Sequence, residues 1–158
     1  MLFLPECFGF MGESSEQTLM NAEQPIMDDT TTNDERISLA LRRMVSDNEA
    51  PDSQCPTDEA EIALLDGLRT IARESGLWIS GGGMHVLGGP PDEKTGNKRV
   101  QNTHVIMDSS GKVKCAYQKI HLFDVSIPGK VSLRESATTA PGTNLVVCDS
   151  PLGKMRLR

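Results

Sequence analysis

The feature that most constrains the fold is a strict alternation of polar and apolar residues that leads into a lysine. Val113, Cys115 and Tyr117 point to one side of the chain and their polar neighbours to the other, which is the period of a half-buried strand. The strand delivers Lys119 to its end, among apolar residues. A partly desolvated ammonium there either has an anionic partner or shifts its pKa. The alternative is an ordinary surface lysine that ends a strand.

This strand is the second arm of a predicted hairpin. Strands at 100–107 and 112–119 flank the sequence Asp-Ser-Ser-Gly at 108–111, which is typical of a tight turn. Two more strands are expected at 145–148 and 154–157, around Ser-Pro-Leu-Gly. The pattern predicts antiparallel pairs in the second half of the chain.

The first half predicts a β-α-β unit. Residues 2–4 are expected to form a buried strand and residues 77–80 the next one. The helix between them begins at Thr57 or Asp58 and ends at Gly76. Its apolar residues form one stripe for core packing, made of Ile62, Leu65, Leu68 and Ile71 or Ala72.

These elements indicate an α/β fold. They also place one glutamate at the end of a strand, where functional residues are often found. Glu6 follows the first strand, and α/β folds collect their chemistry at the carboxyl ends of strands. Taken alone, Glu6 is a polar strand terminus. The three glycines at 81–83 lack the Gly-Lys-Ser/Thr ending of a phosphate loop, so we expect them to let the backbone approach a neighbouring segment.

Composition narrows the possible partners. The chain has 158 residues and a net charge of −6, which allows at most one ordinary domain. The acidic balance argues against nucleic acid, and no apolar run reaches the roughly 20 residues of a membrane span. Without a basic region at the start, the first ten residues make a poor signal peptide. We therefore predict a cytoplasmic protein, with a mitochondrial or plastid location left open.

Metal and disulfide chemistry are not expected. The four cysteines are widely spaced without a Cys-x-x-Cys pair, which predicts reduced thiols, and His85, His104 and His121 share no ligand spacing. Residues 13–56 are polar and acidic and are interpreted as a surface insertion, with a short amphipathic helix at 36–45. The role of this insertion stays open.

Three stretches of the sequence resemble the carbon–nitrogen hydrolase (nitrilase) superfamily. They are Leu-Phe-Leu-Pro-Glu-Cys-Phe-Gly-Phe-Met-Gly at the start, Leu-Trp-Ile-Ser-Gly-Gly-Gly-Met-His at 77–85, and Tyr-Gln-Lys-Ile-His-Leu-Phe-Asp-Val-Ser-Ile-Pro-Gly-Lys at 117–130. The most similar branch contains the nitrilase homologues that hydrolyse the side-chain amides of deaminated glutathione and related ω-amides. The resemblance implies an α-β-β-α sandwich, which usually pairs into a homodimer.

The resemblance also implies roles for three residues. Glu6 matches the family's general base, and Lys119 matches the lysine that stabilises the oxyanion. Glu135 matches a second glutamate that orients the lysine and the substrate. Asn102-Thr-His matches a segment that supports the site without doing chemistry. No metal or organic cofactor is needed.

The nucleophilic cysteine of the family's Glu-Lys-Cys triad is expected in a Cys-Tyr-Asp sequence just after the strand at 154–157. None of Cys7, Cys55, Cys115 and Cys148 matches that position, and Arg156 stands where a small residue is usual. Residues 1–158 are therefore interpreted as the N-terminal half of a nitrilase-type domain. Either a truncated gene model or a degenerate protein would give such a chain.

Three functions follow from this reading. The first is a thiol-dependent amidase that releases ammonia from a small carboxylate-bearing amide. The second is an inactive fragment that acts at most as a binding or assembly partner of a full-length relative. The third is nitrile or carbamoyl hydrolysis within the same superfamily.

Overall fold

The structure is a computed structural model, and it describes residues 1–9, 12, 14–24 and 64–158. The chain divides into two units, Met1–Ile26 with Ala63–Arg158, and Met27–Ile62. The second unit lies outside the described residues. So do the predicted short helix at 36–45, the predicted helix start at 57–58 and most of the polar segment 13–56.

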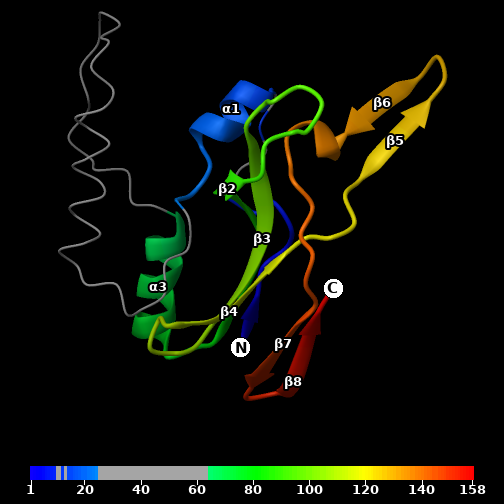
Figure 1. Cartoon of the computed structure of the whole chain (residues 1–158). Coiled ribbons are helices and arrows are strands. Elements are labelled where there is room, and N and C mark those ends of the chain that lie inside the picture. The colour runs from blue at the N-terminus through cyan, green and yellow to red at the C-terminus, as the bar shows by residue number, and fades with distance from the viewer. Residues whose placement is uncertain (10–11, 13, 25–63) are drawn as a thin grey trace, which may run out of the picture. The chain divides into compact units, whose positions relative to one another are not determined.

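A four-stranded sheet organises this unit (Figure 1), and its strand order is β1-β2-β3-β4. β1 runs parallel to β2, whereas β2 with β3 and β3 with β4 are antiparallel. The predicted hairpin is confirmed, because Asp108 Oδ1 accepts the amide protons of Ser110 and Lys112 and closes the turn between β3 and β4. The strands are β1 (Leu2–Phe3), β2 (Ile79–Gly89), β3 (Arg99–Met107) and β4 (Val113–Gln118).

The parallel pairing of β1 with β2 confirms the predicted β-α-β unit, but the prediction that the first strand is buried is wrong. Leu2 is 38 % exposed and Phe3 is 56 % exposed. Among the described strands, β1 pairs with β2 alone. One edge of this short strand therefore carries no described neighbour.

β2 is longer than the predicted strand at 77–80, because it continues through the three glycines. The register with β3 shifts between Ser80 and Gly83, and Gly82 has a positive φ of 54°. A Cβ at Gly82 would collide with the carbonyl oxygen of Pro5 and lie 2.7 Å from that of Leu4. Only glycine fits this irregularity, which lets the chain after β1 lie directly against β2, as expected.

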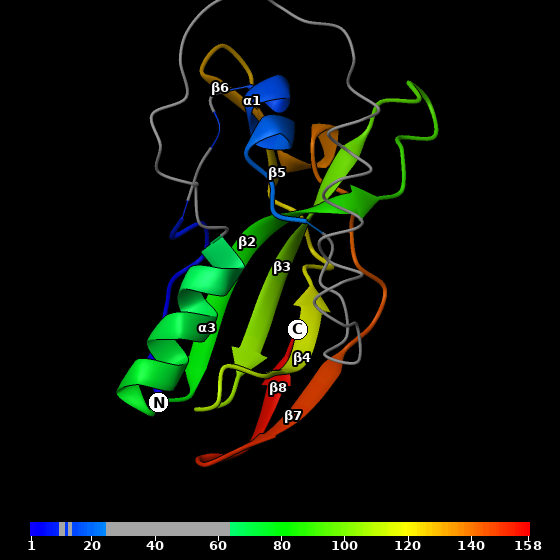
Figure 2. The same ribbon diagram turned by 90° about the vertical axis from the view of Figure 1, so that its left-hand side faces the viewer.

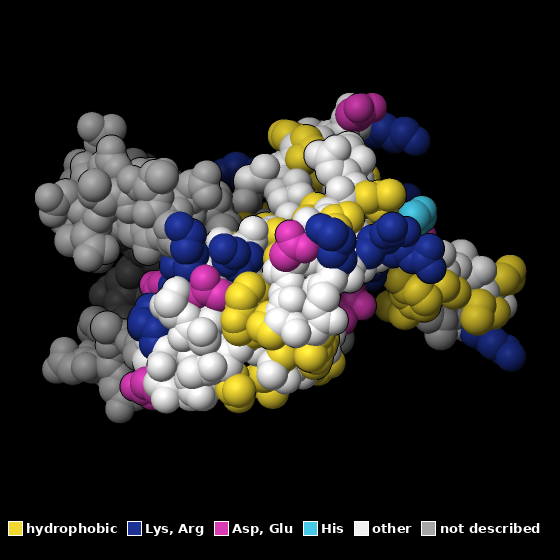
Figure 3. All heavy atoms as spheres, turned by 90° about the horizontal axis from the view of Figure 1, so that it is seen from below, with side chains coloured by type: hydrophobic (Ala, Val, Ile, Leu, Met, Phe, Trp, Pro, Cys, Tyr) yellow, Lys and Arg dark blue, Asp and Glu magenta, His cyan; other side chains and the backbone are white. Residues whose placement is uncertain are grey.

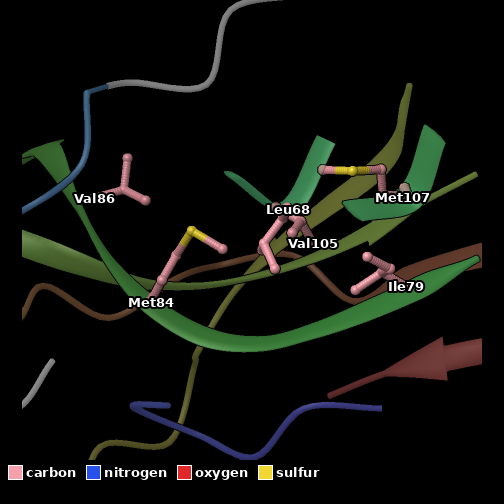
Figure 4. Packing of buried hydrophobic residues seen from close by; sticks show 7 residues of the cluster. Leu68, Ile79, Met84, Val86, Val105 and Met107 are labelled. Carbon is pink, nitrogen blue, oxygen red and sulfur yellow. The ribbon is translucent and has the colours of Figure 1, made fainter. Parts of the chain in front are cut away.

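The helix α3 (Leu64–Ser75) covers one face of the sheet. It ends at Gly76, whose φ of 66° is the left-handed conformation expected of a helix end. Leu68 and Ala72 are buried, whereas Ile71 is 48 % exposed, so the stripe runs through Ala72. They pack with sheet residues in one core cluster (Figure 4), whose sheet members are Ile79, Met84, Val86, Val105 and Met107.

The opposite face of the sheet is covered by a hairpin of β7 (Val146–Ser150) and β8 (Gly153–Leu157). This hairpin confirms the two strands predicted around Ser-Pro-Leu-Gly. Its buried residues Cys148 and Leu157 pack with Ile106 and Tyr117 of the sheet. Figure 2 shows the resulting order of layers, which is helix, sheet and β-hairpin. This order agrees with three layers of the predicted α-β-β-α sandwich.

A short helix and a surface hairpin among the described residues were not predicted. α1 (Ser15–Met20) is a short helix inside the polar segment, and the Ser14 hydroxyl accepts the Gln17 amide proton at its start. A further hairpin, of β5 (Asp124–Ile127) and β6 (Val131–Arg134), has Pro128 and Gly129 in its turn. Both lie at the surface, where periodicity gives little signal.

Hydrophobic side chains also lie on the surface. Figure 3 shows them among lysines and arginines on the face seen from below. The exposed hydrophobic residues of the described chain include Leu145, Val147 and Leu152 of the β7–β8 region, each more than half exposed. Among the described residues, no helix has the length and apolar character that crossing a membrane requires.

Candidate active site

Glu6 is held in place by the irregularity in β2. The Leu4 N–H donates to the Ser80 carbonyl oxygen at 2.9 Å, and the Cys7 N–H donates to that of Gly83 at 2.8 Å. A Cβ on Gly83 would lie 3.1 Å from Cγ of Glu6. The glycines of β2 therefore let residues 4–7 lie close against this strand, which fixes the position of the Glu6 side chain.

Lys119 follows β4 directly, and its backbone is fixed on both sides. Its N–H donates to the Asn102 carbonyl oxygen of β3 at 2.8 Å, and its own carbonyl oxygen accepts the Gly142 N–H at 2.9 Å. These bonds position the long side chain beyond the last residue of the strand. The lysine that the alternating pattern predicted at the end of a strand, and to which the resemblance gave a role in the site, is thus presented by the sheet itself.

Glu135 reaches the same place from a later segment. It begins the short 3-10 helix η1 (Glu135–Ala137), and the residues after it run parallel to β3 through a bridge between Val100 and Thr139. Its side-chain Oε2 accepts the Phe123 N–H at 2.6 Å. The carboxylate is therefore fixed at the start of the β5–β6 hairpin.

The structure brings the three predicted residues into direct contact. Lys119 Nζ lies 2.8 Å from Glu6 Oε1 and 2.9 Å from Glu135 Oε2. Their exposure differs, since the side chain of Glu6 is 53 % exposed and those of Lys119 and Glu135 are 25 % and 17 % exposed. Residues 113 positions apart in the sequence, Glu6 and Lys119, thus meet at one point.

The electrostatics of the cluster favour its charged form. The hydrogen bond from Lys119 is the main cause that holds the pKa of Glu6 below its usual value, while partial burial acts in the opposite direction. Partial burial also acts to lower the pKa of Lys119, but its bonds to Glu6 and Glu135 outweigh it and raise that pKa. At neutral pH the cluster therefore contains a charged ammonium and an ionised Glu6.

Asn102 lies at the centre of the cluster, and its side chain is a direct partner of both glutamates. Its Nδ2 donates to Glu6 Oε1 at 2.6 Å and to Glu135 Oε1 at 3.2 Å. The sequence predicted only that the segment around Asn102 supports the site. An asparagine within an alternating strand carries no further signal, so these contacts come from the structure alone.

Two histidines lie near these elements. His104 Nε2 forms a 2.8 Å hydrogen bond with the Ser80 hydroxyl, which agrees with the structural role expected of this histidine. His85 is the strand partner of Asn102. Burial lowers the pKa of His85, and the charges of Glu135 and Glu6 act in the opposite direction.

Two of the described cysteines, Cys7 and Cys115, have little thiolate character. Partial burial, together with the charges of Glu6 and Glu135, raises the pKa of the Cys7 thiol. Cys115 packs beside Cys148 in the second core cluster, where burial and that neighbouring thiol raise its pKa to about 12. Cys55 lies outside the described residues. Neither Cys7 nor Cys115 is thus an activated nucleophile at neutral pH.

Comparison with known proteins identifies the class to which this fold and site belong. The model of the carbon-nitrogen hydrolase family matches residues 1–157. The chain therefore belongs to the carbon–nitrogen hydrolases, and the resemblance seen in the sequence is confirmed.

Individual relatives agree with this assignment. Deaminated glutathione amidase of Dictyostelium discoideum is 42 % identical over 97 residues, which are 60 % of this chain and 31 % of that protein. The mouse enzyme of the same name is 32 % identical over 158 residues, covering 99 % of this chain and 37 % of its own length. The chain thus spans about a third of the length of these curated relatives.

A solved structure confirms the fold. The crystal structure of the Caenorhabditis elegans NitFhit protein matches 96 % of this chain and 27 % of its own, with 31 % sequence identity and a TM-score of 0.55. The predicted α/β fold of the nitrilase type is therefore correct.

Proposed function

We propose that this chain supplies the base and the oxyanion-stabilising cation of an amidase that hydrolyses a small, carboxylate-bearing linear amide such as deaminated glutathione or an ω-amide. The observation that carries the proposal is the position of Lys119 Nζ between Glu6 and Glu135, at 2.8 and 2.9 Å. Membership of the carbon–nitrogen hydrolases supports the reaction class. The relatives named deaminated glutathione amidase support the substrate class.

The first half of the reaction acylates a thiol. By the resemblance, the nucleophile is a cysteine that follows β8 in the family. Glu6 takes the proton of that thiol while the sulfur forms a bond to the amide carbon. The carbonyl oxygen becomes an anion, which the Lys119 ammonium stabilises. A fixed donor of this kind contributes roughly 3–4 kcal/mol to lowering the barrier.

The loss of ammonia completes the acylation, and hydrolysis of the thioester then releases the acid. The carbon–nitrogen bond breaks as Glu6 returns its proton to the nitrogen, so ammonia leaves and a thioester remains. Glu6 then takes a proton from water, whose oxygen attacks the thioester carbon. The carbon–sulfur bond breaks, the product leaves as a carboxylic acid, and Glu6 returns its proton to the sulfur, which regenerates the thiol and the Glu6 carboxylate. Glu135 keeps Lys119 charged and in place throughout.

A fusion tests this proposal. Residues 1–157 are joined to the part of the Dictyostelium discoideum amidase that follows its matched region, and ammonia release from deaminated glutathione is measured. We expect turnover by the fusion and none by the 158-residue chain alone, because burial raises the pKa of the Cys7 and Cys115 thiols and no cysteine of the chain matches the family's nucleophile position. Changing Lys119→Gln in the fusion should lower kcat roughly 100-fold or more, since the oxyanion loses its cation.

The matched control for Lys119→Gln is Lys114→Gln, on the exposed side of the same strand, which should leave kcat unchanged. A folded fusion that releases no ammonia from deaminated glutathione or from an ω-amide acid would contradict the proposal. Ammonia release that survives Lys119→Gln at full rate would contradict the role given to Lys119.

A further inference from the structure

We infer that Asn102 is a positioning residue of this site, whose amide holds the two glutamates against Lys119 and leaves one oxygen of Glu6 to accept a proton. The inference rests on the proposed amide hydrolysis and deepens it, because it names the residue that fixes the geometry of the base.

Asn102 contacts all three charged residues. Its backbone carbonyl oxygen accepts the Lys119 N–H at 2.8 Å, which fixes the start of the lysine side chain. Its Nδ2 donates to Glu6 Oε1 at 2.6 Å and to Glu135 Oε1 at 3.2 Å. A single residue of β3 therefore aligns the cation with both of its anions.

The side chain of Asn102 has little freedom to do anything else. The residue is only 3 % exposed, and its Oδ1 lies against Gly83 so closely that a Cβ there would collide with it. Ionised carboxylates accept hydrogen bonds only, so the nitrogen and not the oxygen of the amide must face them. The close approach to Gly83 holds the amide in that orientation.

The hydrogen bonds distinguish the four carboxylate oxygens. Glu6 Oε1 accepts from both Lys119 and Asn102. Glu135 Oε2 accepts from Lys119 and from the Phe123 N–H, and Glu135 Oε1 accepts from Asn102. Within the described parts of the chain, Glu6 Oε2 alone of the four receives no hydrogen bond. It is thus the oxygen left to take up the thiol proton.

The charge balance explains why an uncharged donor is useful here. Two carboxylates share one ammonium, and two like charges at one site oppose each other's ionisation. The bond from Lys119 is the main cause of the lowered pKa of Glu6, and the bond from Asn102 acts in the same direction. An amide supplies this second donor without adding a positive charge that would compete with Lys119 for the two glutamates.

The test is a carbon-13 NMR titration of the Glu6 carboxyl group in the 158-residue chain, assigned with Glu6→Gln. We expect Asn102→Ala to raise the proton affinity of Glu6 roughly three- to tenfold, because one charge-assisted hydrogen bond is lost. Asn102→Asp should raise it further, since a like charge replaces the donor. Asn102→Asp keeps the shape of the side chain. It therefore tests the inference even if the cavity left by Asn102→Ala unfolds the chain.

The matched control is Thr103→Val, at the next and equally buried position of β3, whose hydroxyl donates to the Gln101 carbonyl oxygen and to neither of the two glutamates. A merely structural role for Asn102 would move the titration of Glu6 no more than this control does, and that result would overturn the inference. The titration records no turnover. It can therefore fail while the fusion releases ammonia, and the fusion can fail while the titration shifts as expected.

Discussion

Glu6 and Lys119 each stay ionised over a wider range of pH because of the other. The folded-state pKa of Glu6 lies below its ordinary value of 4.5, so the stability from its ionised form is complete above that value and is lost as the pH falls through the folded pKa. The pKa of Lys119 lies above 10.5, so its contribution is complete below that value and is lost only as the pH rises past the folded pKa.

The lowered pKa of Glu6 predicts how the stability of the chain changes at acid pH. As the pH falls below about 5 and through the folded-state pKa of Glu6, the free energy of unfolding of the chain should fall, because the unfolded state binds a proton at Glu6 more readily. Glu6→Gln should make this decline shallower, by a modest amount since the side chain is about half exposed. Urea unfolding at several pH values measures both slopes. Glu74→Gln, exposed on α3, should keep the wild-type slope, and an unchanged slope for Glu6→Gln would contradict the linkage.

At the scale of elements, the irregular part of β2 decides where the site lies. The strand continues past Ser80 only because residues without a side chain let the Pro5 and Leu4 carbonyl oxygens approach it. A regular strand would move the start of the chain outward. Glu6 would then lose its approach to Lys119.

A pair of glycine substitutions tests this. Gly82 and Gly96 both have positive φ, 54° and 71°, but only Gly82 has neighbours that a Cβ would meet. Gly96→Ala should cost about 1 kcal/mol of stability through backbone strain alone. Gly82→Ala should cost about 2–4 kcal/mol, because the collision with backbone atoms adds to the strain. Thermal and urea unfolding measure both, and equal costs would show that β2 can shift without penalty.

At the scale of the whole described unit, β3 joins the two cores. Its alternating side chains supply Val105 and Met107 to the cluster under α3 and Ile106 to the cluster under the β7–β8 hairpin. The period-two geometry of a strand thus places neighbouring residues in opposite layers. We expect a substitution that destabilises one core to destabilise the other core as well.

The single tryptophan of the sequence, Trp78, packs against the second cluster and reports on this coupling. Leu68→Ala, in the first cluster, should lower the free energy of unfolding by about 2–5 kcal/mol. The urea transition seen by Trp78 fluorescence should shift together with the helical circular dichroism signal. Ile71→Ala, on the exposed side of α3, should shift it little. A Trp78 transition that stays in place would show that the two cores unfold separately.

Sequence reasoning predicted the elements whose signals are local. The turn at 108–111, the helix end at Gly76 and the strand leading to Lys119 each depend on residue types within a few positions. It missed the continuation of β2, because three glycines carry no strand propensity of their own. The exposed β5–β6 hairpin and the short α1 were missed because neither buries a continuous apolar face.

The candidate site, like the fold, could be predicted from the sequence only in part. The resemblance named Glu6, Lys119 and Glu135, but their convergence depends on contacts between residues 113 and 16 positions apart. The bond from the Phe123 backbone to Glu135 has no signature in the sequence, because any non-proline residue can donate it. Side-chain identity was predictable here, whereas the network that orients these side chains was not.

The long separation between Glu6 and Lys119 has a consequence during synthesis. While a ribosome makes the chain, the glutamate is added 113 residues before Lys119, so it is without its cation until the lysine has been made. The charged cluster can therefore close only after β4 has docked onto β3, so a nascent chain stopped before residue 119 would display the glutamate without its cation.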